Sequence, residues 1–179
     1  MDSRPAQIVR VNSPSVRGLQ YKGRTVAALS GRVISWHGGT MSSVDDLHGD
    51  PHVEEYLRTG GEHGYHWNGT EILILFTTGN KSGEERRHAL IFRPWGENAY
   101  LVVASKGGTD APPAWFRNLE ANPDAAVQIK DERFAVRARV ATDEEKPQMW
   151  ARMVEVWPDY DAYQAKTSRV IPVVVLERV

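Results

Sequence analysis

Three short apolar segments, joined by connections too short for a helical crossover, constrain the fold of this chain most. Glu71–Thr78 is a continuous apolar run, and Ala89–Phe92 and Tyr100–Ala104 follow it. Apolar runs of this length that are bounded by turn residues are typical of buried strands. Parallel strands need a crossover of a dozen or more residues, so the sequence predicts that these three strands are antiparallel neighbours.

Three more segments extend the sheet. Ala125–Ile129 is followed by a tight turn, and in Phe134–Val140 apolar residues alternate with arginines, the pattern of a strand with one buried face. Val170–Leu176 closes the chain, and Pro172 within it indicates a sheet edge or a bulge. The sum is about six mostly antiparallel strands, which predicts a mainly β fold with inserted helices, either a small barrel or a β roll.

Helical patterns fall between these strands. The segment 52–59 places its apolar residues on one face, and 114–122 begins after two prolines. A stripe of methionine, tryptophan and valine at 149–157 has helical spacing, and we interpret its methionines as core. Tyr160 and Tyr163 are three residues apart on a short helix and therefore share a side.

Composition excludes several classes of protein. The chain of 179 residues contains no cysteine, which rules out disulfides, thiolate catalysis and cysteine-ligated metals and fits a reducing compartment. The net charge of −1 argues against a nucleic-acid partner. No apolar run approaches the roughly 20 residues of a membrane span. These features favour a cytoplasmic protein.

Charge divides the chain at Met41. Residues 1–40 carry six basic residues and one acidic residue, whereas 41–179 have a net charge of −6. We expect 1–40 to be a basic N-terminal extension, either disordered or upstream of a native start at Met41, and 41–179 to be a single domain. A transit peptide or an arm for an anionic surface, such as peripheral contact with the inner face of the plasma membrane, are alternatives.

Four histidines occur between residues 48 and 66. No helical pair with metal-ligand spacing is present, and glycines interrupt the segment. We therefore expect solvated loop histidines and no metal site.

Two glycine-bearing turns at strand ends carry the candidate binding groups. Ser105 to Gly108 lie between a strand and a helix, where a hydroxyl, a cation and free backbone N–H groups meet. Lys81 and Ser82 occupy the other turn, with Arg86 just beyond it, and lysine and arginine are suited to phosphate or carboxylate. Ordinary solvated connections are the alternative for both turns.

Aromatic residues supply a second type of surface. Trp115, Trp157, Tyr160 and Tyr163 are suited to wall a flat ring, and packing is the alternative role for each. The sequence has no P-loop, dinucleotide-binding fingerprint or zinc-protease motif. If the chain is an enzyme, simple acid–base chemistry or an organic cofactor remains, and a basic end beside an aromatic wall fits a phosphorylated flat heterocycle.

Three segments together resemble the deazaflavin-dependent nitroreductases, which are also described as F420H2-dependent quinone reductases. They are TTGNKSGEERRHALI at 77–91, LVVASKGGTDAPPAWFRNLEANPDAAVQI at 101–129, and WARMVEVWPDYDAYQAKTSRVIPVVVLE at 150–177. The resemblance implies a split β-barrel related to FMN-binding barrels, which would make 41–179 an F420-binding domain. It also implies an oxidoreductase that transfers a hydride from reduced coenzyme F420 to a small-molecule acceptor: a quinone, a nitroaromatic or an activated alkene.

The resemblance also implies roles for individual residues. Lys81 and Arg86 would hold the phosphate and acidic tail of the cofactor, while Ser105 and Tyr160 are the expected hydrogen-bond or proton donors. The implied cofactor-binding residues are Lys81, Ser82, Arg86, Arg87, His88, Ser105, Lys106, Gly107, Trp115 and Asn118. The implied catalytic residues are Ser105, Tyr160 and Tyr163, and the implied cover of the substrate pocket is Trp157, Tyr160 and Tyr163.

Two positions depart from the family pattern. Asn80 stands where relatives often have arginine, which removes a cation from the phosphate end, and Ala89 stands where they often have proline. Alternative functions are an FMN- or haem-handling protein of the same fold and a non-catalytic F420 carrier. FMN is accordingly the alternative cofactor.

Overall fold

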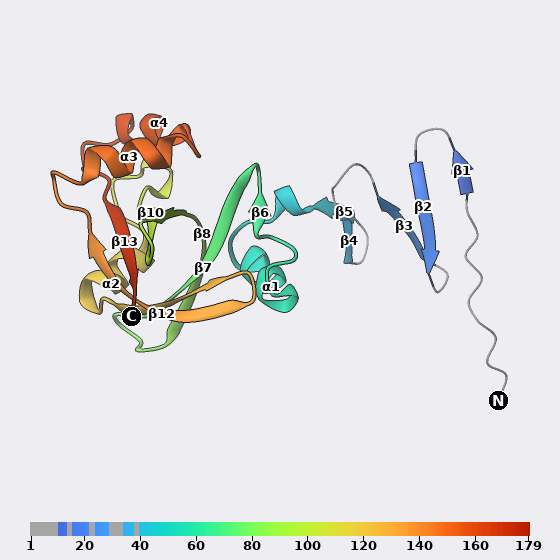
Figure 1. Ribbon diagram of the computed structural model, residues 1–179, viewed down its shortest axis with the longest axis horizontal. Coiled ribbons are helices and arrows are strands. Elements are labelled where there is room, and N and C mark those ends of the chain that lie inside the picture. Colours follow the sequence, from blue (N-terminus) through green and yellow to red (C-terminus); the bar gives the residue numbers. More distant parts are fainter. Residues whose placement is uncertain (1–10, 14–15, 22–23, 29–33, 38–39) are drawn as a thin grey trace. The chain divides into compact units, whose positions relative to one another are not determined.

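The computed structural model describes residues 11–13, 16–21, 24–28, 34–37 and 40–179 (Figure 1). The chain divides into two compact units, Met1–Leu47 and His48–Val179. In the first unit, β1 (Val11–Ser13), β2 (Val16–Tyr21) and β3 (Arg24–Ala28) form an antiparallel sheet, β4 (Ile34–His37) pairs with β5 (Thr40–Ser43), and a 3-10 turn, η1, covers Val44–Asp46. The predicted extension 1–40 lies partly outside the described residues and stays a prediction.

The second unit is built on one mixed-length antiparallel sheet. Its strands are β6 (His66–Trp67), β7 (Thr70–Thr78), β8 (Glu85–Ile91), β9 (Arg93–Trp95), β10 (Ala99–Val103), β11 (Asp124–Ile129), β12 (Glu132–Val140) and β13 (Val173–Arg178). They are hydrogen-bonded in the order β6-β7-β11-β12-β13-β10-β9, and β8 pairs with β7. The six predicted strands are all present, and β6 and β9 are additional.

The segment 85–95 makes the sheet curl. Its first half, β8, pairs with β7, and its second half, β9, pairs with β10. Phe92, which is 2% exposed, separates the two halves. The same segment therefore borders both ends of the sheet, and the fold is mainly β and split-barrel-like. The prediction that 89–92 and 100–104 pair directly was wrong, because the chain bends at Phe92 before it reaches β10.

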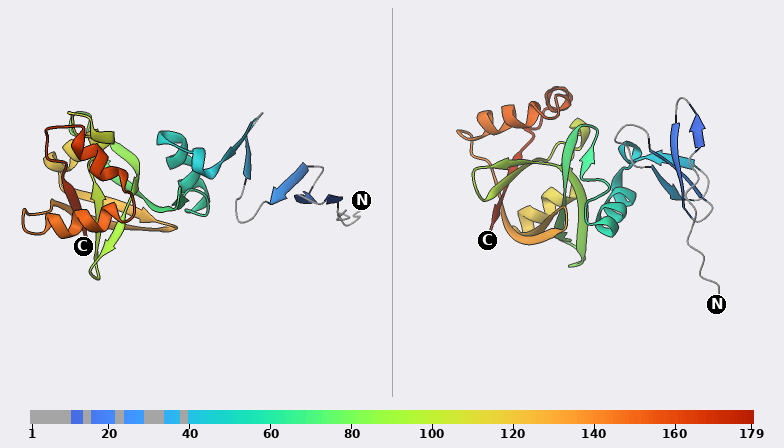
Figure 2. Two further views of the ribbon diagram at one scale, coloured as in Figure 1. Left: turned by 90° about the horizontal axis from the view of Figure 1, so that it is seen from above. Right: turned by 45° about the vertical axis from the view of Figure 1, so that its right-hand side comes forward.

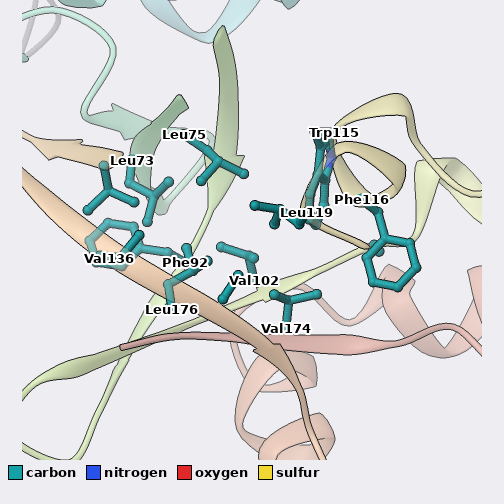
Figure 3. Packing of buried hydrophobic residues seen from close by; sticks show 13 residues of the cluster. Leu73, Leu75, Phe92, Val102, Trp115, Phe116, Leu119, Val136, Val174 and Leu176 are labelled. Atoms are coloured by element: carbon teal, nitrogen blue, oxygen red, sulfur yellow. The ribbon is translucent and has the colours of Figure 1, made fainter. Parts of the chain in front are cut away.

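Alternation along the strands creates an inner and an outer core. On β7, Leu73 and Leu75 face the inner cluster, while Ile72, Ile74 and Phe76 belong to an outer one. A strand in the middle of a curled sheet has to be apolar on both faces, which explains why this run does not alternate in hydrophobicity. Figure 3 shows the inner cluster, in which Val102 and Leu176 from the neighbouring strands β10 and β13 lie near Phe92.

Helices cover the faces and one opening of the sheet. α1 (Gly49–Thr59) packs Val53 and Tyr56 against the outer side of β7. α2 (Ala114–Ala121) inserts Trp115, Phe116 and Leu119 into the inner core (Figure 3). α3 (Lys146–Val154) and α4 (Asp159–Ala165) lie together over the outer side of β10 and β13, where the methionines of α3 are fully buried (Figure 2).

Two details of the C-terminal strand differ from expectation. Pro172 lies before β13, not within it, and its carbonyl accepts a hydrogen bond of 3.0 Å from the Ala104 N–H. β13 lies between β12 and β10, so the predicted edge or bulge was wrong. No helix in the described part of the chain is both long and apolar enough to cross a membrane.

Candidate functional site

Two adjoining cavities in the second unit are lined by every site residue that the resemblance implies. The first has a volume of about 430 Å³, and its lining includes Arg87, His88, Ser105, Lys106, Gly107, Trp115, Trp157, Tyr160 and Tyr163. The second has a volume of about 440 Å³, and its lining includes Lys81, Ser82, Arg86 and Asn118. His88 lines both cavities and marks where they meet. Residues from the β7–β8 turn, the end of β10, α2 and α4 are thus brought together, although their roles stay predictions.

Asn118 holds the β7–β8 turn in place. It is 5% exposed, its Oδ1 accepts a hydrogen bond of 3.1 Å from the Asn80 N–H, and its Nδ2 donates one of 3.0 Å to Thr77 Oγ1. Both ends of the amide are therefore used inside the protein. Asn118 fixes the turn that presents Lys81 and Ser82 to the second cavity, so its action on a ligand there is indirect.

The cations of the second cavity are exposed to solvent, and the ion pair that Arg86 forms is weak. Arg86 Nη2 lies 2.8 Å from Glu84 Oε2 and 3.3 Å from Ser82 Oγ, and its side chain is 52% exposed. Exposed ion pairs of this kind contribute about 0–1 kcal/mol, so an anionic ligand displaces Glu84 at little cost. Arg117 also lines this cavity, one turn of α2 after Ala114. The sequence analysis missed it, although its spacing from Ala114 on a predicted helix places both on one face.

Ser105 and the 3-10 turn η2 (Lys106–Gly108) form one floor of the first cavity. Lys106 has a φ of 48° and Gly107 a φ of 64°, so two successive residues adopt the left-handed conformation. The guanidinium of Arg169 binds the backbone on both sides of this turn. Its Nη2 donates to the carbonyls of Ser105 at 2.7 Å and Ala104 at 3.1 Å, and its Nε donates to the Thr109 carbonyl at 2.7 Å. A strained backbone that is held by a partly buried hydrogen-bond network is found at many ligand-binding sites.

The other wall of the first cavity is aromatic. Tyr160 is 5% exposed and its ring lies edge-on to that of Tyr163, with centroids 6.2 Å apart. Trp157 Nε1 donates a long hydrogen bond of 3.4 Å to Tyr163 Oη. Burial, with a smaller contribution from Tyr163, raises the pKa of Tyr160 well above its ordinary value. The phenol is therefore suited to donate a hydrogen bond and poorly suited to release a proton at neutral pH.

His88 stands at the junction of the two cavities with an unsatisfied ring nitrogen. Its Nε2 is buried and has no hydrogen-bond partner among the described residues. Burial is the main cause that lowers the pKa of His88, although Asp50 opposes it, so the imidazole is neutral at pH 7. A buried polar atom without a partner marks a position for a ligand's polar group.

The segment from His48 to Trp67 contributes a part of the cavity that sequence reasoning missed. His48, Asp50, His52 and Trp67 all line it. The expectation of solvated loop histidines was wrong for His52, which is 3% exposed and whose Nε2 lies 2.8 Å from the Gly64 carbonyl. Burial lowers the pKa of His52. Its position four residues before Tyr56 on the apolar face of α1 was the signal that places it inside.

Another histidine of this segment, His63, forms an ion pair with Glu55. His63 Nδ1 lies 2.7 Å from Glu55 Oε1, which Arg58 also contacts at 2.7 Å. No group of three or more metal-ligating side chains gathers in the part of the chain that the structure describes.

Comparison with known proteins identifies relatives of this chain. The family model described as F420H(2)-dependent quinone reductase matches residues 50–178. An F420H(2)-dependent quinone reductase of Mycobacterium tuberculosis (strain ATCC 25618 / H37Rv) is 40% identical over 131 residues, which cover 71% of this chain and 87% of the relative.

Two solved structures are also similar. An F420-H2 dependent reductase, FDR-A, has a TM-score of 0.55 and 40% identity, with 59% of this chain and 93% of that chain covered. A chain solved as a domain-swapped dimer has a TM-score of 0.58 and 37% identity, with 70% of this chain and 91% of that chain covered. The matched region coincides with the unit that holds both cavities.

Proposed function

Since the chain belongs to the family of F420H(2)-dependent quinone reductases, we propose that it binds reduced coenzyme F420 and transfers a hydride from it to a quinone. The observation that carries this proposal is the pair of cavities joined at His88, one basic and one aromatic. A cofactor with an anionic end and a flat ring needs both surfaces at a fixed separation. The acceptor class extends, by the same chemistry, to nitroaromatics and activated alkenes.

The residues present fit this cofactor. Lys81, Arg86 and Arg117 line the second cavity and are suited to a phosphate and an acidic tail, because exposed cations bind anions through charge-assisted hydrogen bonds. The unsatisfied Nε2 of His88 would bind a polar group between the anionic end and the ring. Asn80 stands where the resemblance leads us to expect arginine. Its backbone N–H donates a hydrogen bond to Asn118 Oδ1, and Arg117 is a further cation of this cavity.

The first cavity is suited to hold the ring and the acceptor. When bound, the reduced deazaflavin supplies the hydride. Ser105, which is 9% exposed, and Tyr160 are placed to donate hydrogen bonds to an acceptor oxygen that gains negative charge. One such donor is typically worth about 3–4 kcal/mol of transition-state stabilisation. Because the pKa of Tyr160 is raised by burial, the proton that completes the reduction comes from solvent, while Tyr160 retains its own.

The absence of cysteine supports a cytoplasmic location, since it fits a reducing compartment. Peripheral membrane contact would bring the site to lipid-soluble quinones, and the basic composition of residues 1–40 is what favours it.

Turnover with purified components tests the activity directly. The protein is mixed with reduced F420 and menadione, and the return of the visible absorbance of oxidised F420 is followed. We expect catalytic oxidation of F420 that depends on both protein and menadione. Tight F420 binding without turnover of any quinone, nitro compound or enone would instead identify a carrier. Co-purification with FMN and indifference to F420 would identify a flavoprotein.

A matched pair of arginines tests the anionic end. Arg86 is 52% exposed and pairs with Glu84 at 2.8 Å, and Arg152 is 53% exposed and pairs with Glu155 at 2.7 Å, yet of the two arginines only Arg86 lines either of the two cavities described above. We expect Arg86→Ala to weaken F420 binding about tenfold in a fluorescence titration and Arg152→Ala to leave it unchanged. The same affinity for both variants would contradict the assignment of the second cavity.

A further inference from the structure

Trp67 is the largest side chain of the first cavity that the proposed mechanism leaves without a role. It ends β6, and the two residues that follow, Asn68 with φ of 47° and Gly69 with φ of 76°, form a tight hairpin turn into β7. Thr70 Oγ1 donates a hydrogen bond of 2.7 Å to the Trp67 carbonyl. The backbone of Trp67 is therefore tied to β7, one of the most deeply buried strands, and its ring stands on a rigid support.

The ring of Trp67 connects two walls of the cavity. It stacks on Trp157, with centroids 5.8 Å apart and an interplanar angle of 26°, and His48 packs edge-on to it at 5.3 Å. Trp157 comes from the turn between α3 and α4, whereas Trp67 ends β6 and His48 immediately precedes α1. Rings at this separation are in direct contact, so a flat molecule does not fit between the two tryptophans without moving one of them.

The indole nitrogen of Trp67 lacks a hydrogen bond. Three side-chain nitrogen atoms in the described part of the chain are buried without a partner, and two of them, Trp67 Nε1 and His88 Nε2, belong to residues of the first cavity. By contrast, Trp150 Nε1 donates to Asp161 Oδ1 at 2.7 Å. An indole N–H is a donor only, and native proteins rarely leave such a group unsatisfied. The partner that it fits is a hydrogen-bond acceptor, such as a carbonyl or nitro oxygen.

We propose that Trp67 is a specificity-determining residue for the electron acceptor. A flat molecule that enters the cavity moves Trp157, packs against the edge of the Trp67 indole, and accepts a hydrogen bond from the in-plane indole N–H through a carbonyl or nitro oxygen. This inference rests on the proposed function for the identity of the ligand, since quinone and nitro oxygens are acceptors only. It assigns to β6 a share of substrate choice that the resemblance places on Trp157, Tyr160 and Tyr163.

The contribution of ring packing on Trp67 is separated from that of the hydrogen bond to its N–H by measuring equilibrium binding of two probes that share a ring system. Menadione carries two carbonyl oxygens, and 2-methylnaphthalene carries none. Each is dialysed against the full chain loaded with oxidised F420, so that no turnover occurs. Trp67→Phe keeps an aromatic face and loses the N–H, Trp67→Leu loses both, and Trp95→Phe is the control, because Trp95 is half-buried in β9 and lines neither cavity.

We expect Trp67→Phe to weaken menadione binding about tenfold and to leave 2-methylnaphthalene binding unchanged, whereas Trp67→Leu weakens both. In steady-state assays the loss appears in KM more than in kcat, because an acceptor-binding contact formed before hydride transfer is removed. Wild-type affinity of Trp67→Phe for menadione, or equal losses for both probes, would overturn the proposal. A wild-type protein that binds menadione in this way but does not oxidise reduced F420 would refute the proposed function and leave the Trp67 site standing.

Discussion

Replacing Gly108 by alanine tests how the turn after β10 sets the position of α4. Gly108 has a φ of 81°, and a Cβ atom there would lie 2.4 Å from the Tyr163 carbonyl oxygen and 3.1 Å from Lys166 Cβ. Its neighbour Gly107 has a φ of 64°, but a Cβ atom there would meet nothing within 4 Å. The two glycines share the conformational cost of alanine and differ only in the collision with α4.

This difference sets the expected magnitudes. A left-handed conformation costs an L-residue about 1–2 kcal/mol, and the lower entropy of the unfolded chain returns about 0.4–1 kcal/mol. Gly107→Ala should therefore lower the free energy of unfolding by about 1 kcal/mol. Gly108→Ala adds about 1–3 kcal/mol for overpacking against a backbone atom, which gives a loss of about 2–4 kcal/mol. In Tm these losses correspond to about 4 °C and about 10 °C.

Urea denaturation of both variants measures the stability difference, and dialysis with menadione measures its effect on the site. Because α4 carries Tyr160 and Tyr163, a displaced helix should also weaken menadione binding by Gly108→Ala relative to the wild type. Equal losses of stability for Gly107→Ala and Gly108→Ala would refute the reasoning, since the collision would then have been relieved without cost. Unchanged menadione affinity in a destabilised Gly108→Ala would show that α4 does not limit the pocket.

Two further substitutions test the supporting contacts of the site. Asn118→Leu leaves the Asn80 N–H and the Thr77 hydroxyl without their partner, so we expect a loss of about 1–3 kcal/mol in urea denaturation together with weaker F420 binding; Asn122→Ala, which removes a single exposed hydrogen bond, is the control and should cost less than 1 kcal/mol. Tyr160→Phe should lower kcat about a hundredfold. The factor should be the same at pH 6 and pH 9, because burial raises the pKa of the phenol and keeps it protonated over this range. A rate loss that shrinks as pH rises would mean that Tyr160 ionises and would contradict the role of hydrogen-bond donor.

Local pattern was sufficient for most of the fold. The apolar run that becomes β7, the alternation of β12 and the proline-initiated helix α2 each carry their own signal, because burial on a sheet face or a helix stripe fixes which positions are apolar. The bend at Phe92 was not predictable in this way. A strand that changes partners has the same composition as one that does not, and the change depends on the curvature of the whole sheet.

The residues of the candidate site also fall into those that the sequence indicated and those that it did not. Residues adjacent to glycine turns were identified in advance, since such turns combine free N–H groups with charged side chains. His52 and Trp67 were not. The helical spacing of His52 from Tyr56 was a local signal that it lies on the apolar face of α1, but its burial depends on α1 packing against β7, and the position of Trp67 depends on the pairing of β6 with β7.

The two sides of the cavity differ in how firmly the core holds them, and this difference bears on how such a site can diverge. The proposed cofactor side comes from the β7–β8 turn, the end of β10 and α2, whose Trp115 and Leu119 are part of the inner core. The proposed acceptor side comes from α1 and α4, which pack on the outer faces of the sheet, and from the short end strand β6. Substitutions near Trp67 or Trp157 therefore disturb an outer layer without opening the sheet. A chain built this way retains one cofactor while its acceptor pocket changes, which is why the choice of acceptor should be sought in the outer layer and the choice of cofactor in the inner one.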